Sequence, residues 1–183
     1  MNDPVKINKS ITTSVYLSLM ISAVFMLLGI IGARPILVLL RTPAERNILS
    51  QAVTYLTTMT CGIIIVAFYN LAAAILRAFG DSKTPLIAMM IAAGMNILLD
   101  LLFVLVFHWG VFGAAFASVL SRCVAFLFCT VKILKIEYVK LDKAAWAWDR
   151  ALTGEIAKFG IPLAIQYVIV NLGGVIVQST IND

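Results

Sequence analysis

The sequence is poor in charged residues. Only 13% of its 183 residues are Asp, Glu, Lys or Arg, whereas about 25% is usual in soluble domains. Hydrophobic residues make up 62% of the chain. That share is too high for one soluble core and predicts an integral membrane protein with several spans. The formal charge of +5 does not indicate a nucleic-acid partner, because the basic residues lie between apolar segments and form no patch.

Cysteine and histidine are also scarce. Cys61, Cys123 and Cys129 lie inside apolar segments and form no C-x-x-C pair, so they predict small buried side chains and neither a disulfide framework nor a metal site. An enzyme embedded in the membrane would need a set such as His/Asp, Ser/Lys or HExxH at membrane depth. The single histidine, His108, lies at the end of an apolar segment without such a partner. We therefore expect neither an enzyme nor a cofactor.

Five apolar segments are long enough to cross a bilayer, since about 20 helical residues span its hydrocarbon core. The expected spans are 12–33, 48–76, 85–107, 111–134 and 159–181. Arg34 and Pro35 mark the exit of the first span, and residues 144–158 predict a short amphipathic helix along the membrane surface. The predicted fold class is all-α, a polytopic membrane helix bundle in which short loops join antiparallel neighbours.

Basic residues are distributed unevenly over the two sides of this bundle. With antiparallel spans, ten basic residues fall on the side of the amino terminus: Lys6, Lys9, Arg77, Lys83, Lys132, Lys135, Lys140, Lys143, Arg150 and Lys158. Three fall on the other side: Arg34, Arg41 and Arg46. The positive-inside rule places the richer side in the cytoplasm. We expect a multi-pass protein of the cytoplasmic membrane, in contact with the lipid bilayer and with a cytoplasmic amino terminus.

Polar residues inside the third expected span indicate a functional site. Asn96 and Asp100 are one helical turn apart and share a helix face. A carboxylate at membrane depth costs about 2.5–3.5 kcal/mol, so Asp100 needs a partner, a proton or a cation. Counting from the expected span ends puts Tyr55 and Ser118 at the level of Asp100, with Asn96 one turn deeper. Such an oxygen-rich set suits a proton or a hard cation, for example Na⁺ at Asp100 and Asn96.

Each member of this set also has a structural interpretation. Tyr55 alone can be a packing or interfacial aromatic residue. Ser118 lies in a run of small residues that favours close helix packing, and Asn96 can be an interhelical hydrogen-bond donor. Asp100 can form an ion pair with Arg122, which follows Ser118 by four residues and shares its helix face. The sequence leaves these alternatives open.

The connection between the second and third expected spans resembles a known motif. Residues 76–85 read LRAFGDSKTP and include Arg77, Gly80, Asp81, Lys83 and Pro85. This segment is similar to the LRGxGDTKTP-like loop of the MATE (multidrug and toxic compound extrusion) family, in particular its prokaryotic NorM- and DinF-like members. The Asn96-x-x-x-Asp100 pair, the small-residue run at 113–118 and a Gly-Ile-Pro triplet at 160–162 then follow in the order that this family shows.

The resemblance implies part of a twelve-span fold. Residues 1–143 would form spans three to six of the amino-terminal lobe, residues 144–158 a cytoplasmic linker, and residues 159–183 the start of a truncated second lobe. The resemblance also implies a cation site to which Tyr55, Asn96 and Asp100 contribute, with Ser118 where threonine is usual. The family carries a further aspartate in its first span, so we expect missing spans of a longer chain to complete the site.

In function, the resemblance implies an antiporter that exports drugs or other small organic compounds in exchange for Na⁺ or H⁺. A lipid-linked precursor flippase of the same superfamily is an alternative; it would require a basic cavity, and Arg122 is the arginine inside a span. A structural membrane fragment without transport is another alternative. It predicts that Asp100 and Tyr55 tolerate apolar replacement.

Overall fold

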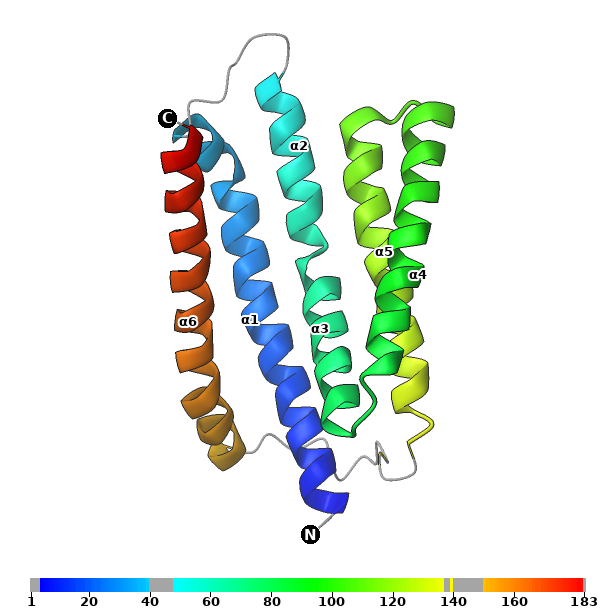
Figure 1. Ribbon diagram of the computed structural model, residues 1–183, viewed down its shortest axis with the longest axis vertical. Helices are drawn as coiled ribbons and strands as arrows, with labels where there is room; N and C mark the ends of the chain where they lie inside the picture. The colour runs from blue at the N-terminus through cyan, green and yellow to red at the C-terminus, as the bar shows by residue number, and fades with distance from the viewer. Residues whose placement is uncertain (1–3, 40–47, 137–138, 140–149, 183) are drawn as a thin grey trace.

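The computed structural model describes residues 4–39, 48–136, 139 and 150–182. Within these residues the regular elements are all helical: α1 (Pro4–Leu39), α2 (Ile48–Cys61), α3 (Ile63–Ala78), α4 (Lys83–Asp100), the π-helix η2 (Leu101–Val106), α5 (Gly110–Ile133) and α6 (Arg150–Asn182). Figure 1 shows them as long rods that run up and down the molecule. The all-α fold class predicted from composition is confirmed.

Four helical segments are long and apolar enough to cross a membrane: Val5–Leu39, Ile48–Ala78, Lys83–Val106 and Gly110–Ile133. They match the first four expected spans to within a few residues, except that the first is longer at both ends. α6 is not among these four within the described residues. The structure therefore shows four of the five spans that the sequence predicts.

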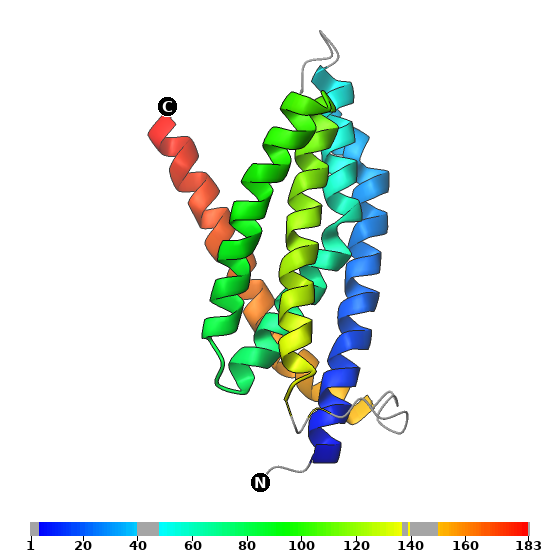
Figure 2. The same ribbon diagram turned by 90° about the vertical axis from the view of Figure 1, so that its right-hand side faces the viewer.

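α6 lies where the fifth span is expected. It begins at Arg150 and continues through Pro162 to Asn182, so residues 150–158 belong to the same helix as the residues that follow them. Residues 144–149, the start of the expected surface helix, lie outside the described residues. α6 contacts α1, and Figure 2 shows that its carboxyl-terminal part diverges from the other helices.

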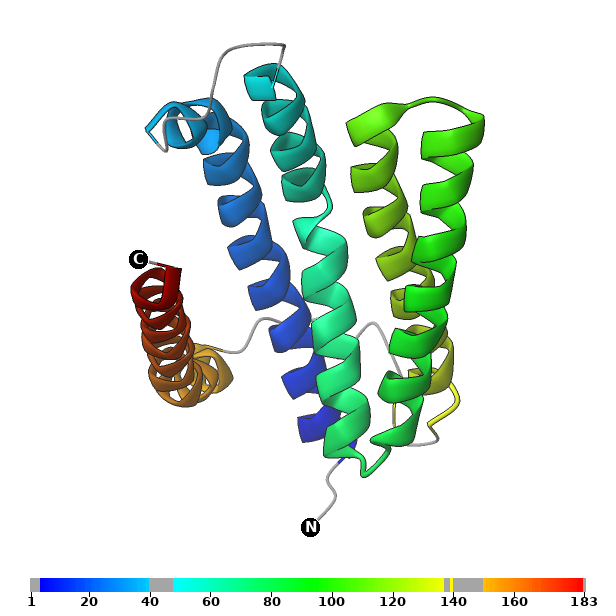
Figure 3. The same ribbon diagram turned by 45° about the horizontal axis from the view of Figure 1, so that its top comes forward.

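α1 does not end where its sequence suggests. Arg34 and Pro35 were expected to mark the exit of the first span, but Pro35 lies inside the helix, which continues to Leu39. Proline removes one backbone hydrogen bond and crowds the preceding turn, which bends a helix without necessarily ending it. Figure 3 shows that the last turns of α1 are bent away from its axis.

α2 and α3 form one span that is interrupted at Gly62. The Gly62 N–H donates to the Thr58 carbonyl and the Gly62 carbonyl accepts from the Val66 N–H, both at 3.2 Å, so the backbone ladder continues across the break. A Cβ atom at position 62 would lie 2.4 Å from Cγ2 of Val119. Glycine therefore allows α5 to approach this span closely.

α5 occupies the centre of the bundle, where it packs against α2, α3 and α4, while α1 packs against α2 and α3. Small side chains dominate the buried positions along these contacts: Ala72, Ala73, Ala88, Ala92, Ala115, Ala117, Ala125 and Cys129. Small residues let helix backbones approach each other within a membrane, where lipid removes most of the hydrophobic driving force. The small-residue run at 113–118 therefore serves helix packing, as its composition suggests.

The helix termini and the connections between helices lie at two opposite ends of the bundle. The start of α1, the α3–α4 connection, the end of α5 and the start of α6 lie at one end of the molecule, and the α4–α5 connection lies at the other (Figure 1). This is the antiparallel arrangement on which the count of basic residues depends. Which end faces the cytoplasm remains a prediction.

The motif at 76–85 consists of two helix caps in succession. Gly80 has a φ of 86°, and its N–H donates to the Arg77 carbonyl at 3.0 Å, while the Asp81 N–H donates to the Leu76 carbonyl at 2.9 Å. These two bonds form a Schellman motif that ends α3, and its left-handed position favours glycine. Arg77 itself is exposed.

The second cap starts α4. Asp81 accepts a hydrogen bond from the Thr84 N–H at 2.9 Å and another from the Thr84 hydroxyl, so its carboxylate satisfies a donor of the first helical turn. Pro85 is buried, and its carbonyl accepts a hydrogen bond from the Tyr69 hydroxyl at 3.3 Å. Lys83 is exposed. The family-like loop thus fixes the tight reversal between two neighbouring spans.

Acid should weaken this cap. Hydrogen bonds from the side chain and then the backbone of Thr84 lower the pKa of Asp81 below its usual range. A carboxyl group whose pKa is lower in the folded state stabilises the fold above its unfolded-state pKa of about 4, and this stabilisation is lost as the pH falls through the lower folded-state value. In detergent, we expect the thermal midpoint of the wild type to fall more steeply below about pH 4 than that of Asp81→Asn, which cannot titrate. Parallel pH profiles would contradict this role.

Candidate functional site

α4 and α5 bring together two of the four polar residues predicted to form the site. The Asn96 Nδ2 donates a hydrogen bond to the Ser118 Oγ at 3.3 Å, and both side chains are half-buried. The Ser118 carbonyl in turn accepts from the Ser121 hydroxyl at 2.9 Å. Asn96 therefore links the two helices, and this bond satisfies polar groups that would otherwise face an apolar environment.

The count from the span ends placed Ser118 level with Asp100, but Ser118 bonds to Asn96, which lies one turn deeper along α4. The count assumed an α-helix from Asp100 to the end of the span, but residues 101–106 form the π-helix η2. A π-helix closes its hydrogen bonds from i to i+5 and so places more residues in each turn. The same number of residues then covers less length, which displaces Asp100 toward the α4–α5 connection relative to a regular helix.

Asp100 is the last residue of α4, directly before this π-helix. Its Oδ1 atom is buried and has no hydrogen-bond partner among the described residues. Among the described residues Oδ1 has no bond to Arg122, the ion-pair partner that the sequence left open as an alternative. A buried carboxylate oxygen left unpaired is costly, so the need for a proton, a cation or a further donor remains after folding of this segment. π-Bulges are frequent at functional sites.

Tyr55 lies on α2 and is not brought to the Asn96–Ser118 pair by any hydrogen bond among the described residues. Its side chain is 41% exposed. The structure therefore leaves its expected contribution to a cation site as a prediction.

Binding of Na⁺ also stays a prediction. The described residues contain no group of three or more His, Cys, Asp or Glu side chains that could hold a metal ion. A cation here would depend on a single carboxylate together with amide and hydroxyl oxygens.

A cavity of about 420 Å³ lies beside the Asn96–Ser118 pair and is lined by residues of α2, α3, α4 and α5. Its lining comprises Met59, Val66, Tyr69, Met89, Ala92, Ala93, Asn96, Ser118, Val119, Ser121, Arg122 and Ala125. Tyr69 and Ser121 were missed from the sequence, whereas Arg122 was considered as a partner of Asp100 and as the intramembrane arginine of the flippase alternative. The available signal for Arg122 was its position in the middle of an apolar segment.

Aromatic rings cluster beyond Asp100, on η2 and at the start of α5. Phe103 stacks on Trp109 with ring centroids 5.0 Å apart and contacts Phe116 at 5.7 Å. Phe107 and Phe112 extend the same cluster. Trp109 therefore packs within an aromatic cluster at this end of the bundle.

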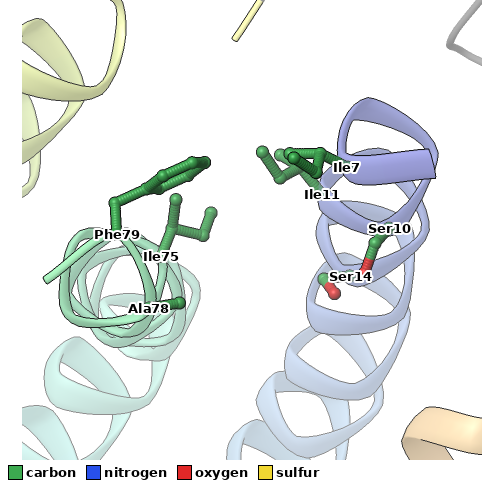
Figure 4. A pocket seen from close by; sticks show the side chains of 7 residues that line it. All are labelled: Ile7, Ser10, Ile11, Ser14, Ile75, Ala78 and Phe79. Atoms are coloured by element: carbon green, nitrogen blue, oxygen red, sulfur yellow. The ribbon is translucent and has the colours of Figure 1, made fainter. Parts of the chain in front are cut away.

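A second cavity, of about 520 Å³, lies between α1 and α3 near the amino terminus. Figure 4 shows Ile7 and Ile11 of α1 opposite Phe79 and Ile75 of α3. Two hydroxyls line its α1 side, those of Ser10 and Ser14, and none of the described residues that line it is charged. Its polar groups are therefore confined to one wall, and the rest of the surface is apolar.

Comparison with known proteins decides the family. A family profile described as MatE matches residues 1–102. The chain belongs to the MATE family. Two curated relatives, both from Bacillus subtilis (strain 168), are named probable multidrug resistance proteins: YpnP is 34% identical over 79% of this chain and 32% of its own length, and YoeA is 27% identical over 93% of this chain and 38% of its own length.

The solved structures agree with the family assignment. A multidrug resistance MATE family transporter of the MOP superfamily, in an inward-facing conformation, superposes with a TM-score of 0.73 at 23% identity and covers 87% of this chain and 41% of its own. This match confirms the MATE fold. The chain spans about a third of the length of the two curated relatives named above. MATE proteins are multi-pass membrane transporters.

Proposed function

We propose that this MATE chain contributes the cation-coupled part of a transporter that exports small organic compounds across the cytoplasmic membrane. The observation that carries the proposal is the buried, unpartnered Oδ1 of Asp100 at the junction of α4 and the π-helix. An unpartnered carboxylate oxygen at membrane depth is costly, and a bound cation or proton would offset that cost.

The coupling mechanism uses the contact between α4 and α5. When Asp100 binds a cation or a proton, its charge is neutralised and the end of α4 packs against apolar neighbours at lower cost. When Asp100 releases the ion, its ionised carboxylate favours a conformation in which water or a hydrogen-bond donor contacts it. The ion shifts the equilibrium between two packings only by its difference in affinity for them. The Asn96–Ser118 bond transmits the position of α4 to α5.

The test is dye efflux by the intact gene product that carries this sequence, reconstituted into proteoliposomes. Vesicles are loaded with rhodamine B or its ethyl ester, and efflux is followed by fluorescence under an inward Na⁺ gradient, an inward proton gradient or neither. The proposal requires that one of the two gradients accelerates efflux of at least one dye. Equal rates in all three conditions would refute cation coupling.

A further inference from the structure

Arg122 is placed where an arginine is costly. It lies at the middle of the 24-residue helix α5, so roughly 18 Å of helix separates it from either end. Arginine side chains reach the interface by snorkelling only from positions near helix ends. Arg122 instead lines the cavity of about 420 Å³ beside Asn96 and Ser118, and the residue as a whole is exposed.

No carboxylate of the described chain neutralises this guanidinium. The acidic residues in the described ranges are Asp81, Asp100 and Glu155. Asp81 binds Thr84 in the α3–α4 connection, Asp100 has an unpartnered Oδ1, and Glu155 lies on α6. None of the three lines the cavity. Within the described residues, the cavity therefore has a cationic wall with amide and hydroxyl groups beside it.

We propose that Arg122 determines substrate specificity by binding the acidic group of an anionic or zwitterionic amphiphile. A guanidinium presents a rigid fork of donors that matches a carboxylate or phosphate in two parallel hydrogen bonds. Met59, Val66 and Met89 line the same cavity and offer flexible apolar contacts to the remainder of the molecule. Its volume of about 420 Å³ lies within the range of about 300–1,000 Å³ usual for small-molecule sites.

This inference rests on the proposed export function for its biological meaning, but its test does not depend on transport. Equilibrium binding is measured with the intact gene product in phosphatidylcholine nanodiscs, without any gradient. The probes are rhodamine B and its ethyl ester, which share one cationic aromatic ring system and differ in a single carboxylate, so rhodamine B is a zwitterion and the ester a cation. Empty nanodiscs correct for partition into lipid. A failure of cation coupling would leave this measurement unaffected, and a failure here would leave cation coupling untouched.

Arg122→Gln should weaken binding of rhodamine B by about tenfold or more, because a hydrogen bond to a charged group is lost, and leave the ester unaffected or slightly stronger. Arg122→Lys keeps the charge without the fork and should lose less. Arg34→Gln removes the same charge from α1, outside the cavity, and should change neither dye. If Arg122→Gln fails to fold, Arg122→Lys against Arg34→Lys provides the comparison. Equal loss of both dyes, or no loss of rhodamine B, would overturn the proposal.

The source of the acidic group is determined in the same assay. Phosphatidylglycerol is added to the nanodiscs in place of part of the phosphatidylcholine. If it displaces rhodamine B from the wild type but not from Arg122→Gln, which lacks the charge, the acidic group belongs to a lipid headgroup. If it does not compete, the ligand is a soluble acid. Both results support the binding of an acidic ligand at Arg122. If the wild type instead binds the ester more tightly than rhodamine B, Arg122 does not bind an acidic ligand.

Discussion

Asp100→Asn should remove gradient-driven efflux while the protein remains folded. The substitution keeps the shape of the side chain and supplies a hydrogen-bond donor to the buried position of Oδ1, but it takes away the group that binds the coupling ion. Coupling free energies of about 1–3 kcal/mol correspond to about 5- to 150-fold in affinity. We therefore expect acceleration of efflux by the effective gradient to fall by a factor in that range, with the rate measured without a gradient little changed.

The control for this experiment is Glu155→Gln. Glu155 is an exposed acidic residue on α6 that lines none of the cavities described above, so its neutralisation should leave coupling intact. Thermal unfolding of Asp100→Asn should occur at the same temperature as for the wild type or slightly higher, because an unpaired buried carboxylate is replaced by a neutral amide. Full gradient acceleration in Asp100→Asn would show that the coupling ion binds elsewhere.

The helical architecture follows from the sequence because membrane spans obey two strong constraints. Long apolar segments must form helices to satisfy their backbone groups in lipid, and about 20 residues are needed to cross. These constraints predicted three spans within a few residues of their observed limits and a fourth, the first in the chain, that is longer at both ends than expected. They failed to place the end of α1, because a proline such as Pro35 can bend a helix as well as end it.

The details of the site depend on features that leave little trace in the sequence. The six apolar residues of η2 have no composition that distinguishes a π-helix from an α-helix. The residue count therefore ignored this turn when it placed Ser118 beside Asp100, whereas Ser118 bonds to Asn96. Which side of a span faces a cavity is also decided by neighbouring helices, so Tyr69 could not be identified as a lining residue. Arg122 was visible in the sequence, but its lack of a carboxylate partner among the described residues is a three-dimensional property.

Gly62→Ala should destabilise the bundle, although alanine is the better helix former. The new Cβ would lie 2.4 Å from Cγ2 and 3.2 Å from Cβ of Val119, and a β-branched side chain has little freedom to move aside. Overpacking of this kind costs about 1–3 kcal/mol. We expect a lower thermal midpoint in detergent for Gly62→Ala. Gly94→Ala is the matched control, because a Cβ there meets no atom within 4 Å, and it should be neutral or slightly stabilising.

A second substitution separates the steric clash from any backbone effect at position 62. Gly62 has a φ of −75°, which alanine adopts without strain, so the expected loss comes only from Val119. Val119→Ala removes the Cγ atoms that the new Cβ would meet. In the Val119→Ala background, adding Gly62→Ala should therefore cost much less stability than it costs in the wild type. If the two losses simply add, the helix break at Gly62 requires glycine for its backbone, and the close approach of α5 is not the reason for it.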